Sequence, residues 1–111
     1  MIELTPAVGL LLALATVMGY LLGSVSGSLV LGRLRQIDIR AMGSGNAGGT
    51  NALRTQGWRF ALGVLVIDIG KGVLAAWAVP KTLLALNWIP EELQITAAAV
   101  ASFAAIVGHI W

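Results

Sequence analysis

The residues best suited to chemistry lie in one glycine-rich segment, residues 43–54. It reads Gly-Ser-Gly-Asn-Ala-Gly-Gly-Thr-Asn-Ala-Leu-Arg and contains no carboxylate. Glycines permit positive φ angles and close approach of the backbone to a ligand, and successive N–H groups in such turns can form anion-binding nests. The missing carboxylates disfavour a magnesium site, since magnesium is usually held through one or two of them. The segment therefore predicts a phosphate-binding loop that uses no metal and no cofactor.

Six residues of this segment are the candidate phosphate ligands. They are Ser44, Gly45, Asn46, Thr50, Asn51 and Arg54. The hydroxyl and amide side chains supply donors, and the forked guanidinium suits phosphate oxygens. Thr50 or Asn51 is also expected to cap a short helix that carries Arg54, whose N-terminal dipole would favour the same anion.

Three other interpretations of the glycine-rich segment are weaker. Residues 43–48 match G-x-G-x-x-G, but that dinucleotide motif needs a strand before it, a helix after it and a βαβ unit around it. A Walker A motif is excluded because no Gly-Lys-Ser/Thr follows the glycines. A flexible connector would leave the two asparagines, the threonine and the arginine unexplained.

Asp68, Lys71 and His109 are candidate supporting residues because they are ionisable groups within apolar segments. Asp68 and Lys71, three residues apart on one helical face, can pair, so a structural and a functional role remain equally open. His109 has no cysteine or histidine companion for a zinc site. We expect a hydrogen-bonded histidine rather than a general base, although His109 is the one candidate for that catalytic role.

The composition of the chain places these residues on membrane helices. Of its 111 residues, 58% are hydrophobic and 11% charged, and the mean hydropathy is +0.88, which points to a bilayer. Three apolar segments, residues 5–32, 60–80 and 93–111, are long enough to cross one, which takes roughly 20 residues. A cleaved signal peptide is disfavoured because the first segment lacks a positive n-region. We therefore predict a single all-α integral membrane domain, residues 1–111, with a long loop at residues 33–59.

The positive charges set the expected orientation. The loop holds five arginines, the second connection one lysine and the N-terminal tail no basic residue. By the positive-inside rule the loop is cytoplasmic, the N-terminus outside, and His109 on the side of the loop. Because five of the seven basic residues lie in this loop, the rest of the chain cannot form a separate basic surface for a nucleic-acid partner.

The first apolar segment carries a stripe of small residues, Gly19, Gly23 and Gly27. Small residues at steps of four let helix backbones approach closely in lipid. We expect this stripe to pack against another helix.

Five short motifs, taken in their order along the sequence, resemble those of one family. They are Tyr20-Leu-Leu-Gly-Ser-Val-Ser-Gly27, Asp38-Ile-Arg40, the segment 43–54, Asp68-Ile-Gly-Lys-Gly72 and Gly108-His109. Together they are similar to bacterial acyl-phosphate:glycerol-3-phosphate acyltransferases. The resemblance covers nearly all of the chain after the first dozen residues, and the Gly-Ser-Gly-Asn…Thr-Asn…Arg string is its most specific part.

The resemblance implies a multi-pass enzyme of the bacterial inner membrane, with seven helices around a cytoplasm-facing site. Its expected reaction transfers an acyl group from acyl phosphate to the 1-hydroxyl of glycerol 3-phosphate, in the first step of phospholipid synthesis. Membrane lipids and the soluble enzyme that makes acyl phosphate are the further expected partners. A later Gly-Gly-Lys-Gly motif and a His- and Asn-bearing motif of the family lie beyond Trp111. The chain is therefore expected to be the N-terminal half of such an enzyme.

Two functions of other classes compete with this interpretation. A small transporter element would use Asp68 and Lys71 to line a polar path, yet the third segment offers only Gln94, Thr96 and Ser102 as polar residues along its length. A non-catalytic half that assembles with a separate fragment is the second alternative.

Overall fold

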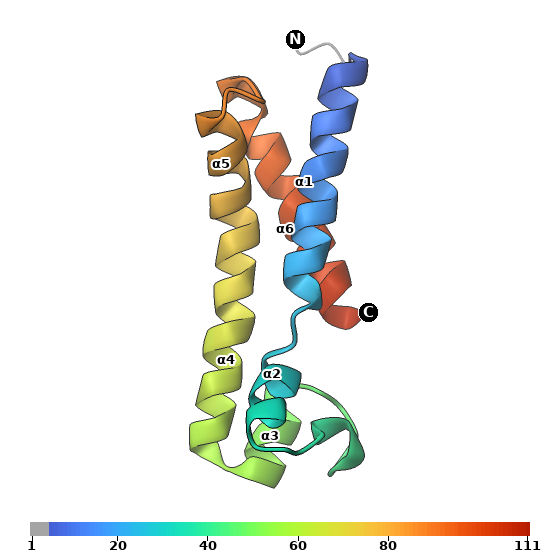
Figure 1. Cartoon of the computed structure of the whole chain (residues 1–111), viewed down its shortest axis with the longest axis vertical. Helices are drawn as coiled ribbons and strands as arrows, with labels where there is room; N and C mark the ends of the chain where they lie inside the picture. The colour runs from blue at the N-terminus through green and yellow to red at the C-terminus, as the bar shows by residue number, and fades with distance from the viewer. Residues whose placement is uncertain (1–4) are drawn as a thin grey trace. The chain divides into compact units, whose positions relative to one another are not determined.

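The computed structural model describes residues 5–111, and every regular element in that range is helical (Figure 1). Three helices are long and apolar enough to cross a membrane: Pro6–Ser24, Trp58–Ala85 and Glu91–Ile110. A helix is suited to lipid because it satisfies its own backbone hydrogen bonds. The prediction of an all-α chain with three such helices is confirmed.

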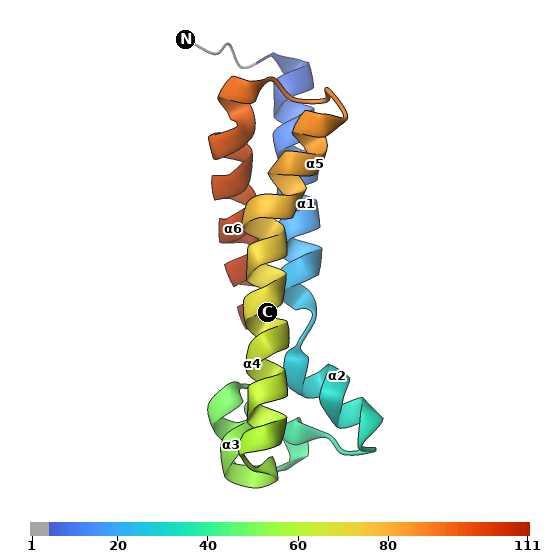
Figure 2. The same cartoon turned by 90° about the vertical axis from the view of Figure 1, so that its left-hand side faces the viewer.

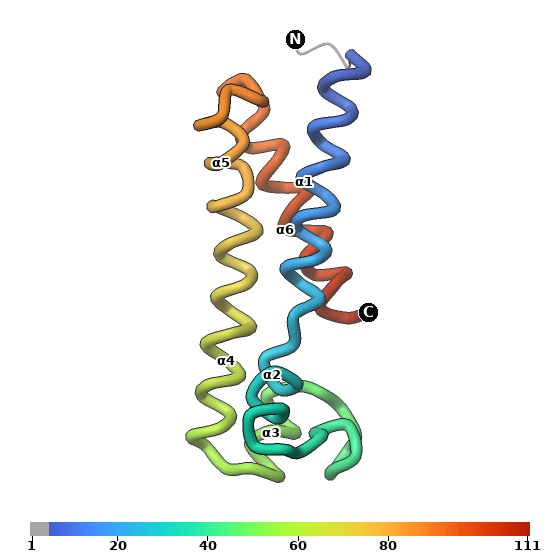
Figure 3. Tube along the Cα trace, viewed as in Figure 1, coloured from blue at the N-terminus to red at the C-terminus, as the bar shows by residue number. Residues whose placement is uncertain are grey.

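Figure 3 traces the elements in chain order. They are α1 (Pro6–Ser24), α2 (Gly27–Leu34), the 3₁₀ turn η1 (Ile39–Ala41), α3 (Gly49–Gln56), α4 (Trp58–Val73), the π-helical segment η2 (Leu74–Ala78), α5 (Val79–Ala85), the 3₁₀ turn η3 (Glu91–Leu93) and α6 (Gln94–Ile110).

The first apolar segment is not one helix over residues 5–32, as the sequence suggested. Helix α1 ends at Ser24, and α2 begins anew at Gly27. The Ser26 side chain caps α2 by accepting from the Leu29 N–H at 3.3 Å, and Asp68 Oδ1 accepts from the Gly27 N–H at 3.1 Å. These two acceptors satisfy amides that a continuous helix would have bonded to its own carbonyls.

The second and third membrane spans contain more helix than expected. The second span runs from Trp58 to Ala85 and passes Pro80, where the sequence suggested an end. Helix α5 begins at Val79, directly after η2, and Pro80 occupies its first turn, where the missing N–H is tolerated. The third span begins at Glu91 rather than at residue 93. Residues 33–59 contain η1 and α3, and α3 is the short helix that was expected to carry Arg54.

The chain divides into two compact units. The first unit joins the segment up to Ser24 to Lys71–Trp111, and in it α1 and α6 lie side by side (Figures 1 and 2). A Cβ added at Gly19 or Gly23 would collide with the backbone of Ala101 or Ala105 in α6. The small-residue stripe therefore does pack against a helix, and that helix is α6 for these two glycines.

The second unit, Val25–Gly70, holds the glycine-rich segment. Its buried apolar residues are Ile39, Ala52, Phe60 and Val64, and the Arg35 guanidinium lies 4.9 Å above the Phe60 ring. Gly27, the third residue of the stripe, belongs here, because its close neighbour is the backbone of Val64 in α4. The core thus fixes η1 and α3 against the start of α4.

Candidate phosphate-binding site

The turn that leads into α3 depends on glycine at two positions. Gly43 has a φ of +52° and Gly45 a φ of +79°, values that side-chain-bearing residues rarely adopt. A Cβ at Gly43 would also clash with the side chains of Asn51 and Thr55. The segment is therefore a specific folded turn rather than a flexible connector.

Asn51 is the centre of this turn, and its side chain is only 3% exposed. Its Nδ2 lies within donor distance of three carbonyl oxygens, those of Ile39 at 3.3 Å, Met42 at 3.0 Å and Asn46 at 2.9 Å. Its Oδ1 accepts from the Ser44 N–H at 3.2 Å. The predicted direct contact between this side chain and a phosphate is thus not what the structure presents. Asn51 instead holds the turn in shape.

The turn also uses most of the amides that were expected to form a nest. The Ser44 N–H is bonded to Asn51, the Gly45 N–H donates to the Met42 carbonyl at 2.9 Å, and the Asn46 N–H donates to Ser44 Oγ at 3.4 Å. These three donors are directed at the turn itself. The side chains of Ser44 and Asn46 are exposed, as is Gly45.

The donors that are open to an anion lie at the first turn of α3. The expected cap by Thr50 or Asn51 is wrong: the N-cap is Gly48, which has no side chain to offer. The first intrahelical amide bond runs from Ala52 to Gly48 at 3.0 Å, so three N–H groups precede the helix ladder. Those of Gly49 and Thr50 belong to residues that are at least partly exposed, whereas Asn51 is buried. Such an uncapped helix start attracts anions.

Thr50 and Arg54 lie on the same face of α3. They are four residues apart, which brings Cβ atoms to about 5–6 Å of one another on a helix, and side chains of a helix lean towards its N-terminus. Both are exposed, and Arg54 forms no ion pair with any residue in the range 5–111. A hydroxyl and a guanidinium thus flank the open amides.

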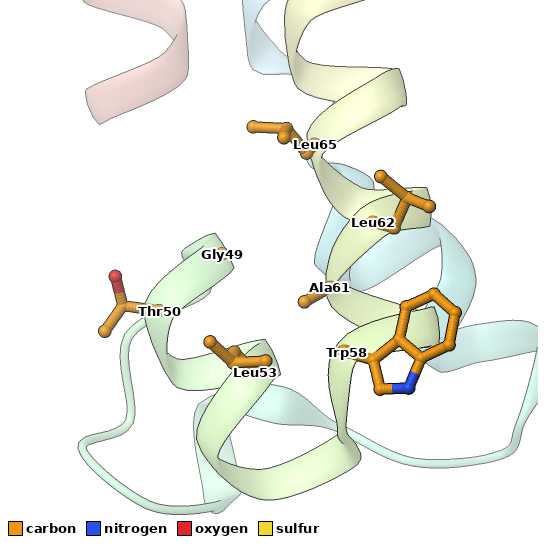
Figure 4. A pocket seen from close by; sticks show the side chains of 7 residues that line it. All are labelled: Gly49, Thr50, Leu53, Trp58, Ala61, Leu62 and Leu65. Atoms are coloured by element: carbon orange, nitrogen blue, oxygen red, sulfur yellow. The ribbon is translucent and has the colours of Figure 1, made fainter.

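An apolar hollow of about 540 Å³ adjoins this first turn (Figure 4). Figure 4 shows α3 on one side of it and the start of α4 on the other. It is lined by Gly49, Thr50, Leu53, Trp58, Ala61, Leu62 and Leu65. The same short helix therefore presents polar donors at its start and an apolar wall beside them, which suits a ligand with a phosphate head and a hydrocarbon tail.

Asp38 and Arg40 form a forked pair at the entrance to η1. Asp38 Oδ1 accepts from Arg40 Nε at 3.0 Å, and Oδ2 accepts from Nη2 at 3.1 Å. The side-chain hydrogen bond to Arg40 lowers the pKa of Asp38 below its ordinary value, and the bond from the Arg40 backbone N–H acts in the same direction. Arg40 is thereby neutralised locally, which distinguishes it from Arg54.

The three supporting residues are divided between the two units. Asp68 belongs to the second unit and caps the start of α2 through Gly27. Lys71 belongs to the first unit, where its Nζ lies 2.8 Å from the Gly23 carbonyl oxygen and 2.8 Å from His109 Nδ1. The contact between Lys71 and His109 joins residues 38 positions apart, a separation at which sequence spacing carries no signal. His109 is hydrogen-bonded, as expected.

The comparisons with known proteins agree on one family. A sequence profile described as glycerol-3-phosphate acyltransferase matches residues 13–111. The chain is 46% identical over 103 residues to a glycerol-3-phosphate acyltransferase of Chlorobaculum parvum, covering 90% of this chain and 44% of that protein. It is 45% identical over 98 residues to that of Chlorobaculum tepidum, with 86% and 42% covered. The chain thus spans less than half the length of these curated relatives. No solved structure matches it significantly.

Proposed function

The chain belongs to the glycerol-3-phosphate acyltransferase family, and from this membership we propose that it contributes the phosphate-binding part of a membrane acyltransferase. The acyl donor is an acyl phosphate, and the acceptor is the 1-hydroxyl of glycerol 3-phosphate. The products are lysophosphatidate and inorganic phosphate. Lysophosphatidate is the precursor of membrane phospholipids, so the expected place of the reaction is the cytoplasmic face of the bacterial inner membrane.

The observation that carries the proposal is the first turn of α3. Its open amides, the Thr50 hydroxyl and the Arg54 guanidinium offer donors to phosphate oxygens. The adjoining hollow offers an apolar surface to the acyl chain of the donor. Ser44, Gly45 and Asn46 lie on the exposed side of the same turn, within the segment that would face the second phosphate. Asn51 supports this arrangement from inside.

The chemistry requires no covalent intermediate on the protein. The hydroxyl oxygen of glycerol 3-phosphate attacks the acyl carbonyl carbon, the bond from that carbon to the phosphate oxygen breaks, and phosphate leaves. The hydroxyl proton passes to a phosphate oxygen. A protein can accelerate such a step by holding the two substrates together and by stabilising the charge that develops on the oxygens. In this proposal, Arg54 and the α3 amides perform that task.

An assay on the purified chain in lipid nanodiscs tests the proposal. Acyl phosphate and labelled glycerol 3-phosphate are supplied, and labelled lysophosphatidate is measured. We expect Arg54→Ala to lower product formation about 10- to 100-fold, the effect of losing a hydrogen bond between charged groups. Arg33→Ala, which removes the same charge from α2, is the matched control.

Two results would count against the proposal. Equal product from Arg54→Ala and the unchanged chain would show that Arg54 does not bind a reacting phosphate. Absence of product from the unchanged chain would contradict the proposal that this chain is catalytic by itself. The proposed phosphate binding would then be measured by ³¹P line broadening. A non-catalytic assembly role predicts neither product nor line broadening.

A further inference from the structure

A buried lysine joins three helical segments in the unit formed by the segment up to Ser24 and Lys71–Trp111. Lys71 is 8% exposed. Its Nζ lies 2.8 Å from the carbonyl oxygen of Gly23 at the end of α1 and 2.8 Å from Nδ1 of His109 at the end of α6. The two helix ends are themselves in backbone contact, because a Cβ at Gly108 would collide with the Tyr20 carbonyl and approach Ser24. The position of His109 beside the lysine is therefore fixed by packing.

The chemistry of an ammonium group decides which atom carries the proton in this contact. A lysine ammonium has three N–H donors and no lone pair. Gly23 is in the last turn of α1, where carbonyl oxygens lack helical partners and the helix dipole favours a cation. Lys71 thus donates to Gly23, and it can only donate to His109. Nδ1 must then present its lone pair, and a neutral imidazole in that state carries its proton on Nε2.

We propose that Lys71 is a positioning residue that holds His109 as the neutral imidazole protonated on Nε2. The Nδ1 lone pair is then occupied, and Nε2 is a hydrogen-bond donor. His109 in this state cannot take the proton of an attacking hydroxyl at either nitrogen. It can donate from Nε2 to an anion, and this last step rests on the proposed function, in which the anion is a substrate phosphate.

The single histidine of the sequence makes the test unambiguous. The chain is labelled with ¹⁵N-histidine, placed in lipid nanodiscs near neutral pH, and its two ring nitrogens are observed through their couplings to the ring protons. We expect one nitrogen signal typical of an unprotonated Nδ1 and one typical of a protonated Nε2. A ring protonated on Nδ1, or on both nitrogens, overturns the inference without any variant.

Two lysine variants test whether Lys71 is the cause. In Lys71→Met we expect the single tautomer to give way to an exchange-averaged mixture of both. Lys81→Met is the matched control, because the chain has only these two lysines and Lys81 is exposed and lies over the Trp77 ring instead. An unchanged tautomer in Lys71→Met would overturn the positioning role.

Adding glycerol 3-phosphate separates this inference from the proposed function. A shift of the Nε2 signal on addition supports donation to a phosphate. An unchanged Nε2 signal contradicts donation from His109 to a substrate phosphate, but it does not affect the conclusion about the tautomer. Loss of the proposed acyltransferase activity would equally leave the tautomer unaffected, so the two failures are distinguishable.

Discussion

Asn51 reaches back over the glycine-rich turn and donates from Nδ2 to the carbonyl oxygen of Asn46 at 2.9 Å. The same side chain accepts from the Ser44 N–H through Oδ1, so one buried amide holds both flanks of Gly45. A side chain that makes several internal bonds has little capacity left for a ligand. Its effect on phosphate binding is exerted through the shape of the turn and through the direction in which the α3 amides point.

Replacing this amide should therefore disrupt the turn as a whole. Asn51→Ala leaves the Asn46 carbonyl and the Ser44 N–H without the partner that Asn51 supplies. It also removes one of the two donors of the Ile39 and Met42 carbonyls, and we expect a loss of about 1–3 kcal/mol in local stability. Amide hydrogen exchange at residues 43–49 would report it. Asn46→Ala is the matched control, because Asn46 takes part through its carbonyl, which alanine retains. Equal protection in both variants would contradict the role assigned to Asn51.

Gly43 should not tolerate any side chain. Gly43→Ala forces a Cβ into the left-handed region and against the side chains of Asn51 and Thr55, at a cost of about 1–2 kcal/mol from the backbone alone. Gly49→Ala is the control, since a Cβ there meets nothing within 4 Å. Phosphate line broadening and thermal unfolding in detergent should both separate the two variants. A normal Gly43→Ala protein would show that the turn is free to rearrange.

The carboxylate of Asp68 should stabilise the start of α2 by accepting from the Gly27 N–H. Asp68→Asn retains an oxygen that can accept from the Gly27 N–H, whereas Asp68→Leu leaves that amide unpaired. We expect the leucine variant to lose about 1–2 kcal/mol, as on removal of a helix cap, and the asparagine variant to lose less. Unfolding monitored by circular dichroism would compare them. An equal loss in both would indicate that the negative charge itself is required.

The Asp38–Arg40 pair should show its effect only above acidic pH. Hydrogen bonding to Arg40 holds the folded-state pKa of Asp38 below its ordinary value of 3.8. Stabilisation from such a lowered carboxyl is present above the unfolded-state pKa and is lost as the pH falls through the folded-state pKa. NMR titration of the labelled Asp38 carboxyl carbon measures this pKa, and we expect it to rise in Arg40→Gln. Arg33→Gln is the control and should leave the pKa of Asp38 unchanged. A changed pKa in Arg33→Gln would contradict the pairing of Asp38 with Arg40.

The sequence was sufficient to predict those features that follow from local composition. Long apolar runs predict helices because a helix satisfies the backbone of one segment within that segment, and the three spans follow from that rule. The stripe at Gly19 and Gly23 likewise predicted a close helix contact. The break after Ser24 was missed because Val25, Ser26 and Gly27 are apolar or small enough to continue a membrane helix.

The inner contacts of the site could not be predicted in the same way. Ser44, Thr50 and Asn51 have similar donor chemistry in the sequence, and only the fold shows that Asn51 is directed inward while the other two are exposed. The capping of α2 by Asp68 joins residues 41 positions apart. Such pairs depend on how the helices pack, and no local spacing encodes them.

The backbone contact between α1 and α6 has a consequence for genetics. Gly19 and Gly23 can accept no heavier side chain, because the main chain of α6 occupies the space. On the exposed side of α1, Leu10, Val17 and Leu21 lie open and should exchange freely among apolar residues. In a saturation-mutagenesis library, intolerant positions of α1 should recur with a period of four residues. This four-residue period would show which face of α1 packs against α6 from the viability of the mutants alone.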